Sequence, residues 1–157
     1  MNSAPLSSHI TAAANASCLT PTVIADFDAA RYMGTWFEIS RVPYLPFQPA
    51  SKTCTEAQYS GLTSAGAFEV LNSEQDKYYD VPRKYAQGSG QASATPGWFY
   101  VHFGGPQPTQ VNYQVVATDY DNYSIVYGCT SAQVSPDIWY LSRAPIVPSN
   151  WIATRNA

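Results

Sequence analysis

Short runs of alternating apolar and polar residues follow one another along most of the chain, and glycine, proline or other turn residues close each run. Such alternation is typical of β-strands with one buried face, because successive side chains point to opposite sides of a strand. One helical turn is expected before the first strand, over 26–31, with Asp26 as its N-cap. The pattern predicts eight strands, which cover residues 36–42, 53–60, 67–73, 83–94, 98–103, 111–120, 123–130 and 138–142.

The connections between these strands are short, as in an antiparallel meander. Only Asp121 and Asn122 separate the sixth and seventh runs, and residues of this kind favour a two-residue hairpin turn. Eight antiparallel strands protect their edges by closing into a barrel. The expected fold is an all-β, eight-stranded antiparallel up-and-down β-barrel in a single domain over 18–157, preceded by a flexible tail over 1–17.

The alternation also predicts which side chains point into the barrel. In one run, for example, Phe68, Val70 and Asn72 share a face of the strand. An eight-stranded interior is either filled by side chains or holds one small ligand, and a mixture of rings with small and polar residues is typical of a ligand cavity. We therefore expect a cavity lined by Tyr59, Phe68, Val70, Phe99, Val101, Phe103, Tyr113 and Trp139, with Tyr44 and Phe47 at its mouth.

The segment 43–51 carries three prolines and several apolar residues, and we expect it to form a lid over the cavity mouth. The alternatives are a loop packed onto the barrel rim and an apolar patch for a partner. Few charges are expected in the interior, so that ring stacking and burial supply the affinity. The hydroxyls of Tyr59 and Tyr113 are expected to orient any polar group of the ligand.

Composition and charge exclude several classes of function. Charged residues make up 12% of the chain, aromatic residues 14%, and the net charge is −3 without a basic stripe, which argues against nucleic-acid binding. No run approaches the roughly 18 apolar residues of a membrane span. The three cysteines, at 18, 54 and 129, form no Cys-x-x-Cys pair, so we expect no metal site. Their spacing suits one long-range disulfide and one thiol, and three reduced cysteines remain the alternative.

Three short motifs mark the ends of predicted strands. They are Gly34 and Trp36 at the first strand, Thr118-Asp119-Tyr120 before the last hairpin, and Arg143 after the last strand. In this order they resemble the motifs of the lipocalin family, and the chain over 18–148 looks closest to its apolipoprotein D and bilin-binding branch. The resemblance implies that Trp36 closes the base of the barrel and that Arg143 stacks on its indole, so that these residues maintain the fold.

The resemblance also implies a disulfide between Cys18 and Cys129, with Cys54 left free or paired between chains. Lipocalins normally follow the last strand with a helix packed on the barrel, whereas 14 residues follow Arg143 here. The C-terminal helix is therefore expected to be short or missing, with one turn over 150–155. The outward side chains of Ile125 and Tyr127 would then be uncovered and available for a homo-oligomer.

The function implied is extracellular binding and transport or storage of a small hydrophobic molecule: a bilin, a carotenoid, a retinoid, a sterol or a fatty acid. No catalytic residue and no required cofactor are expected, with biliverdin or a carotenoid as candidate bound chromophores. Bilin propionates would point out of the mouth towards Arg41 or Lys52. The chain is expected to be secreted, although no signal peptide is evident. The alternatives are an isomerase-type enzyme of the same fold that uses Cys54, and an interaction protein with a filled barrel.

Overall fold

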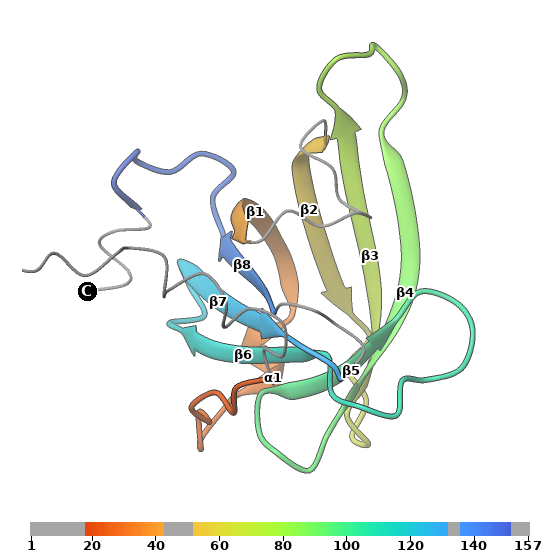
Figure 1. Ribbon diagram of the computed structural model, residues 1–157, viewed down its shortest axis with the longest axis vertical. Helices are drawn as coiled ribbons and strands as arrows, with labels where there is room; N and C mark the ends of the chain where they lie inside the picture. The colour runs from red at the N-terminus through yellow and green to blue at the C-terminus, as the bar shows by residue number, and fades with distance from the viewer. Residues whose placement is uncertain (1–17, 43–51, 132–135, 152–157) are drawn as a thin grey trace, which may run out of the picture.

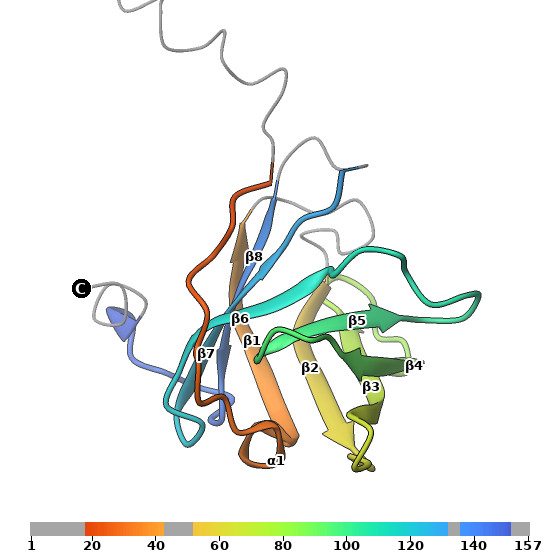
Figure 2. The same cartoon turned by 90° about the horizontal axis from the view of Figure 1, so that it is seen from below.

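The computed structural model describes residues 18–42, 52–131 and 136–151 (Figures 1 and 2). A helical turn precedes eight strands, which are hydrogen-bonded in chain order, and β8 returns to pair with β1. The expected eight-stranded antiparallel barrel is therefore confirmed. Its elements are α1 (Ala29–Tyr32), β1 (Gly34–Val42), β2 (Lys52–Ser60), β3 (Ala67–Asp76), β4 (Lys84–Ala92), β5 (Trp98–His102), β6 (Tyr113–Thr118), β7 (Tyr123–Gly128) and β8 (Asp137–Ser142).

Several predicted features lie outside the described residues. They are the tail over 1–17, the lid over 43–51 with Tyr44 and Phe47, and most of the turn expected over 150–155. The side chains of Lys52 and Cys54 on β2 are likewise outside the described part. No helix in the described ranges is long and apolar enough to cross a membrane.

The strands differ from the prediction mainly at their ends. The third strand continues to Asp76 because Glu74 pairs with Lys84 and Asp76 with Lys52, although this polar stretch lacks a hydrophobic alternation. The β3–β4 hairpin consequently projects beyond the rest of the barrel (Figure 1). The sixth strand is shorter than predicted at both ends. Before it, the Asn112 side chain bonds the backbone N–H and carbonyl of Val101, and after it Tyr120 has a positive φ.

The two predicted turns near the base of the barrel were wrong in detail. The β6–β7 turn spans residues 119–122 rather than two residues, since the Asp119 carboxylate accepts hydrogen bonds from the backbone N–H groups of Asn122 (2.8 Å) and Tyr123 (3.0 Å). Tyr120 within it has φ = 68°, which ends the extended strand. The helical turn is capped by Asp28, not Asp26, because its Oδ1 accepts from the backbone N–H of Arg31 at 3.0 Å.

The core is an aromatic cluster in the lower half of the barrel. Trp36 is 0% exposed and Tyr32 is 1% exposed, and both belong to one cluster with Phe68 and Phe99. Gly90 on β4 makes room for this cluster, because a Cβ there would collide with the Phe68 ring. The packing fills the base and leaves the other end of the barrel for the cavity described below.

The segment that follows Cys18 covers part of the outer face of β7. A disulfide joins Cys18 to Cys129, as the resemblance implied, and the segment that follows Cys18 runs beside β7 (Figure 2). The Leu19 backbone N–H donates to the Tyr127 hydroxyl at 2.9 Å, and Tyr127 is only 7% exposed. At Tyr127 the prediction of an uncovered outer face was therefore wrong, because the disulfide holds the N-terminal segment against this side chain. Ile125 is half-buried.

Candidate ligand-binding site

A cavity of about 760 Å³ occupies the barrel above the aromatic base. Side chains from β1, β2, β3, β4, β5 and β8 line it, together with Asn112 and Tyr113 where β6 begins. Binding pockets for small organic molecules typically measure about 300–1,000 Å³. The space is therefore large enough for one ligand.

Six of the eight described side chains that were expected in the lining are there. Two are not: Phe68 and Phe99 are 6% and 2% exposed and pack edge-to-face below the cavity, with 5.3 Å between ring centroids. Phe103 lies just beyond the end of β5 and is 47% exposed, so it belongs to the rim. The six in the lining are Tyr59, Val70, Val101, Phe103, Tyr113 and Trp139.

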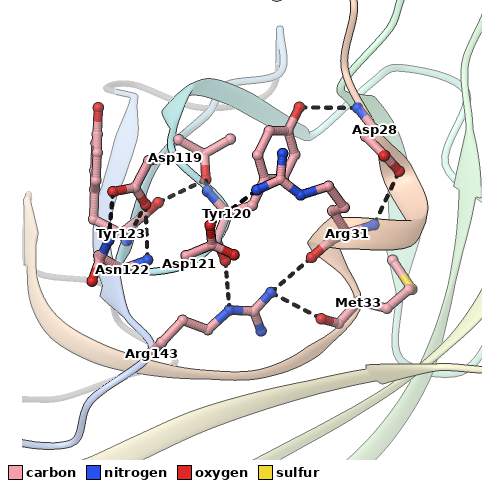
Figure 3. Close-up of polar contacts among 10 residues, drawn as sticks. Asp28, Arg31, Met33, Asp119, Tyr120, Asp121, Asn122, Tyr123 and Arg143 are labelled. Carbon is pink, nitrogen blue, oxygen red and sulfur yellow. Dashed lines mark hydrogen bonds and ion pairs between the residues drawn. The ribbon is translucent and has the colours of Figure 1, made fainter.

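The base of the barrel is closed by Trp36 and Arg143. The guanidinium carbon of Arg143 lies 3.6 Å from the centroid of the Trp36 ring, so the implied stack is present. The same guanidinium donates to the carbonyl oxygens of Met33 and Tyr120, each at 2.9 Å (Figure 3). It also donates to the carbonyl oxygen of Thr35 at 2.9 Å. Arg143 thereby ties the start of β1 to the end of β6 and excludes solvent from beneath the cavity.

The remaining motif residues surround this plug and have structural roles. Gly34 has φ = 99°, and a Cβ there would lie 3.2 Å from Nη1 of Arg143, so the position favours glycine. The Thr118 hydroxyl donates to the carbonyl of Tyr123 and accepts from the backbone N–H of Tyr120. The Tyr120 hydroxyl in turn accepts from the backbone N–H of Asp28, which fixes α1 against the β6–β7 turn.

Four hydroxyl groups form a buried chain at the cavity floor. Tyr32 lies 2.9 Å from both the Tyr113 and the Ser124 hydroxyls, and the Tyr59 hydroxyl donates to that of Tyr113, also at 2.9 Å. Burial raises the pKa of Tyr32 to about 12 and the pKa values of Tyr59 and Tyr113 well above their usual range, so these groups stay neutral. Because Tyr59 and Tyr113 bond one another, they have less capacity to orient a ligand than the sequence predicted.

The cavity wall formed by β1, β2 and β3 is more polar than predicted. Glu38 lines it and forms an ion pair with Arg41, and their side chains are 9% and 13% exposed. Arg41 is therefore paired with Glu38. From the sequence it was expected to lie near the cavity mouth and face the propionates of a bilin. Thr55 and Asn72 also line this wall, and neither Oγ1 of Thr55 nor Oδ1 of Asn72 has a hydrogen-bond partner. The alternation placed Thr55 with Tyr59, and Glu38 with Trp36, on inward faces, so a signal for this polar wall was present in the sequence.

A closed eight-stranded barrel with an internal cavity above a closed base is typical of the barrel proteins that enclose small molecules. The chain belongs to the lipocalin family, because the family model for a lipocalin-like domain matches residues 27–155. Apolipoprotein D of Oryctolagus cuniculus is 34% identical over 139 residues, which are 88% of this chain and 66% of that protein. The Lazarillo protein of Schistocerca americana is 34% identical over 134 residues, which are 81% of this chain and 60% of that protein.

Solved structures agree with this assignment. The structure of insecticyanin from the tobacco hornworm Manduca sexta superposes with a TM-score of 0.69 at 26% identity, over 89% of this chain and 76% of that one. The chain thus spans about two thirds of the length of the apolipoprotein D relatives, 60% of the Lazarillo protein and about three quarters of insecticyanin. Members of the family bind and carry small hydrophobic molecules.

Proposed function

We propose that this protein binds one small hydrophobic molecule inside its barrel and carries or stores it outside the cell. The observation that carries the proposal is the 760 Å³ cavity, which has Trp36 at its base and Val101, Trp139 and Leu141 along one wall. A barrel that served only as an interaction scaffold would gain stability by filling this space with side chains. The cavity therefore favours ligand binding over the filled-barrel alternative.

The extracellular setting is supported by the disulfide between Cys18 and Cys129, since disulfides persist in oxidising compartments.

Biliverdin and a carotenoid remain the candidate chromophores, and no cofactor is needed for binding itself. An isomerase that uses Cys54 is the alternative function, and binding is the function proposed.

A titration followed by tryptophan fluorescence tests the proposal, because Trp36 and Trp139 both line the cavity. Biliverdin, a carotenoid, retinol and a fatty acid form the panel, and at least one is expected to quench the emission at micromolar concentration. Ala57→Phe, which places a ring inside the cavity, should abolish that binding. Gln58→Phe adds the same ring at the exposed neighbouring position and should leave it intact. Quenching by none of the four, or equal binding by the two variants, would contradict the proposal.

A further inference from the structure

The β6–β7 turn carries an acceptor motif for N-linked glycans. Asn122-Tyr123-Ser124 has the Asn-x-Ser pattern, with a residue other than proline in the middle. Asn122 is exposed, and its carbonyl accepts from the backbone N–H of Arg143 at 3.0 Å, so the turn lies against the base of the barrel. The cavity lining described above contains no residue of this turn. A glycan on Asn122 would therefore extend from the closed end of the barrel and leave the cavity mouth clear.

The hydrogen bonds of Asn122 are compatible with a glycan. Its Nδ2 donates to Oδ2 of Asp119 at 2.9 Å, and its backbone N–H donates to Oδ1 of the same carboxylate at 2.8 Å (Figure 3). A side-chain amide nitrogen has two hydrogens, and an N-linked sugar replaces one of them. The second hydrogen remains as a donor to Asp119, so the turn that this carboxylate organises is retained after modification.

Ser124, the second recognition residue of the motif, is enclosed by the fold. Its side chain is 0% exposed, and its hydroxyl lies 2.9 Å from the hydroxyl of Tyr32. A transferase that recognises Asn-x-Ser must reach both the amide and the hydroxyl. The folded barrel presents the amide alone, so transfer to Asn122 has to precede the burial of Ser124.

The contacts that bury Ser124 are completed after the motif has been synthesised. Ser124 pairs with Leu141 of β8, which follows it in the chain. Cys129 also follows the motif, and its disulfide to Cys18 spans 111 residues. Contacts between distant parts of a chain form slowly, because a long loop has to close first. A nascent chain therefore exposes both Asn122 and Ser124 until β8 and the disulfide are in place.

We propose that Asn122 is an N-glycan acceptor that is modified before the barrel closes, with an occupancy set by how fast Ser124 is buried. The second substrate is an oligosaccharide linked to a lipid diphosphate. Nδ2 of Asn122 forms a bond to the anomeric carbon of the first sugar, and the bond from that carbon to the diphosphate oxygen breaks. The lipid diphosphate leaves, and Nδ2 gives up one proton to a base of the transferase. The inference extends the proposed extracellular setting and does not depend on the ligand in the cavity.

Translation in the presence of endoplasmic reticulum microsomes tests the acceptor. The full chain carries a cleavable signal peptide, and Asn15→Gln removes the second motif, Asn15-Ala16-Ser17, from every variant. We expect one shifted band that endoglycosidase H removes. Asn122→Gln should lose this band, whereas Tyr123→Phe, which keeps the motif, should retain it. A parent chain without the band, or an Asn122→Gln chain that keeps it, would overturn the acceptor.

The dependence on folding is tested with the transferase limiting, so that only part of the parent chain is modified. Cys18→Ser prevents the disulfide and delays burial of Ser124, so the modified fraction should rise. Cys54→Ser removes a cysteine outside this disulfide and should leave the fraction unchanged. Equal fractions in Cys18→Ser and Cys54→Ser would contradict a competition between transfer and folding.

A second measurement offers purified protein to the solubilised transferase with a lipid-linked oligosaccharide. The folded, oxidised chain should remain unmodified, and the reduced, unfolded chain should be modified at Asn122. Equal modification of the two would show that burial of Ser124 does not control transfer and would overturn that part of the proposal. The isolated glycoprotein should melt no lower than the unmodified chain, because Asp119 keeps its donor, and a large fall would contradict the compatibility of the turn with a glycan. None of these readouts uses a ligand, so they are decided separately from ligand binding.

Discussion

Replacing Arg143 by methionine should destabilise the barrel through the loss of one guanidinium group at its base. Arg143 donates to the carbonyls of Thr35, Met33 and Tyr120 at 2.9 Å each, and its guanidinium stacks on Trp36 at 3.6 Å. Each hydrogen bond contributes about 1 kcal/mol net, and the cation–π contact adds about 1 kcal/mol. Partial exposure of the side chain lowers the total, so we expect a loss of about 3 kcal/mol in the free energy of unfolding. For a domain of this size, that corresponds to roughly 6–12 °C in melting temperature.

Thermal and urea unfolding followed by circular dichroism, with the disulfide intact, would measure this loss. Arg31→Met is the matched control, because Arg31 makes a salt bridge to Asp121 at 3.0 Å in which the side chains are 51% and 75% exposed. Exposed ion pairs contribute at most about 1 kcal/mol. Equal losses in Arg31→Met and Arg143→Met, or an unchanged melting temperature in Arg143→Met, would refute the role assigned to the base.

Three further predictions concern the core, the disulfide and the buried tyrosines. Trp36→Ala removes a fully buried ring and should cost about 3–5 kcal/mol in urea unfolding; a parent-like midpoint would contradict the plug. Reduction of the Cys18–Cys129 bond, which spans 111 residues, should lower stability by about 4–5 kcal/mol on the chain-entropy model, and alkylation of the unreduced, denatured chain should label Cys54 alone. Burial raises the pKa of Tyr32 to about 12, so above pH 10 the unfolded chain releases a proton that the folded chain retains. Stability should therefore fall as pH rises from about 10 to about 12, and a flat unfolding profile over this range would count against the buried hydroxyl chain.

The alternation of side chains predicted the barrel and much of its lining, because both follow from the two-residue period of a strand. Tyr59, Val70 and Val101 line the cavity for this reason. The alternation carries no information on depth along the barrel axis, however. Phe68 and Phe99 do point inward, but they lie at the level of the base, where they pack against each other instead of facing the cavity.

Irregular backbone explains what the sequence did not predict. Residues three apart on a regular strand face opposite sides, yet Glu38 and Arg41 meet in an ion pair because the pairing of β1 with β8 shifts between Glu38 and Ser40. No residue pattern in the sequence predicts that shift in strand pairing. Arg41 was therefore expected at the mouth of the cavity. Similarly, the length of the β6–β7 turn depends on the Asp119 carboxylate, whose hydrogen bonds to the backbone compete with a two-residue turn.

A crystal structure of the protein in complex with the panel compound that binds most tightly would test the central claim most directly. The account predicts ligand density inside the barrel, above Trp36 and in contact with Tyr59, Val101 and Trp139, with the eight-stranded register unchanged. Density on the outer surface, or a barrel whose side chains have closed the 760 Å³ cavity, would contradict it.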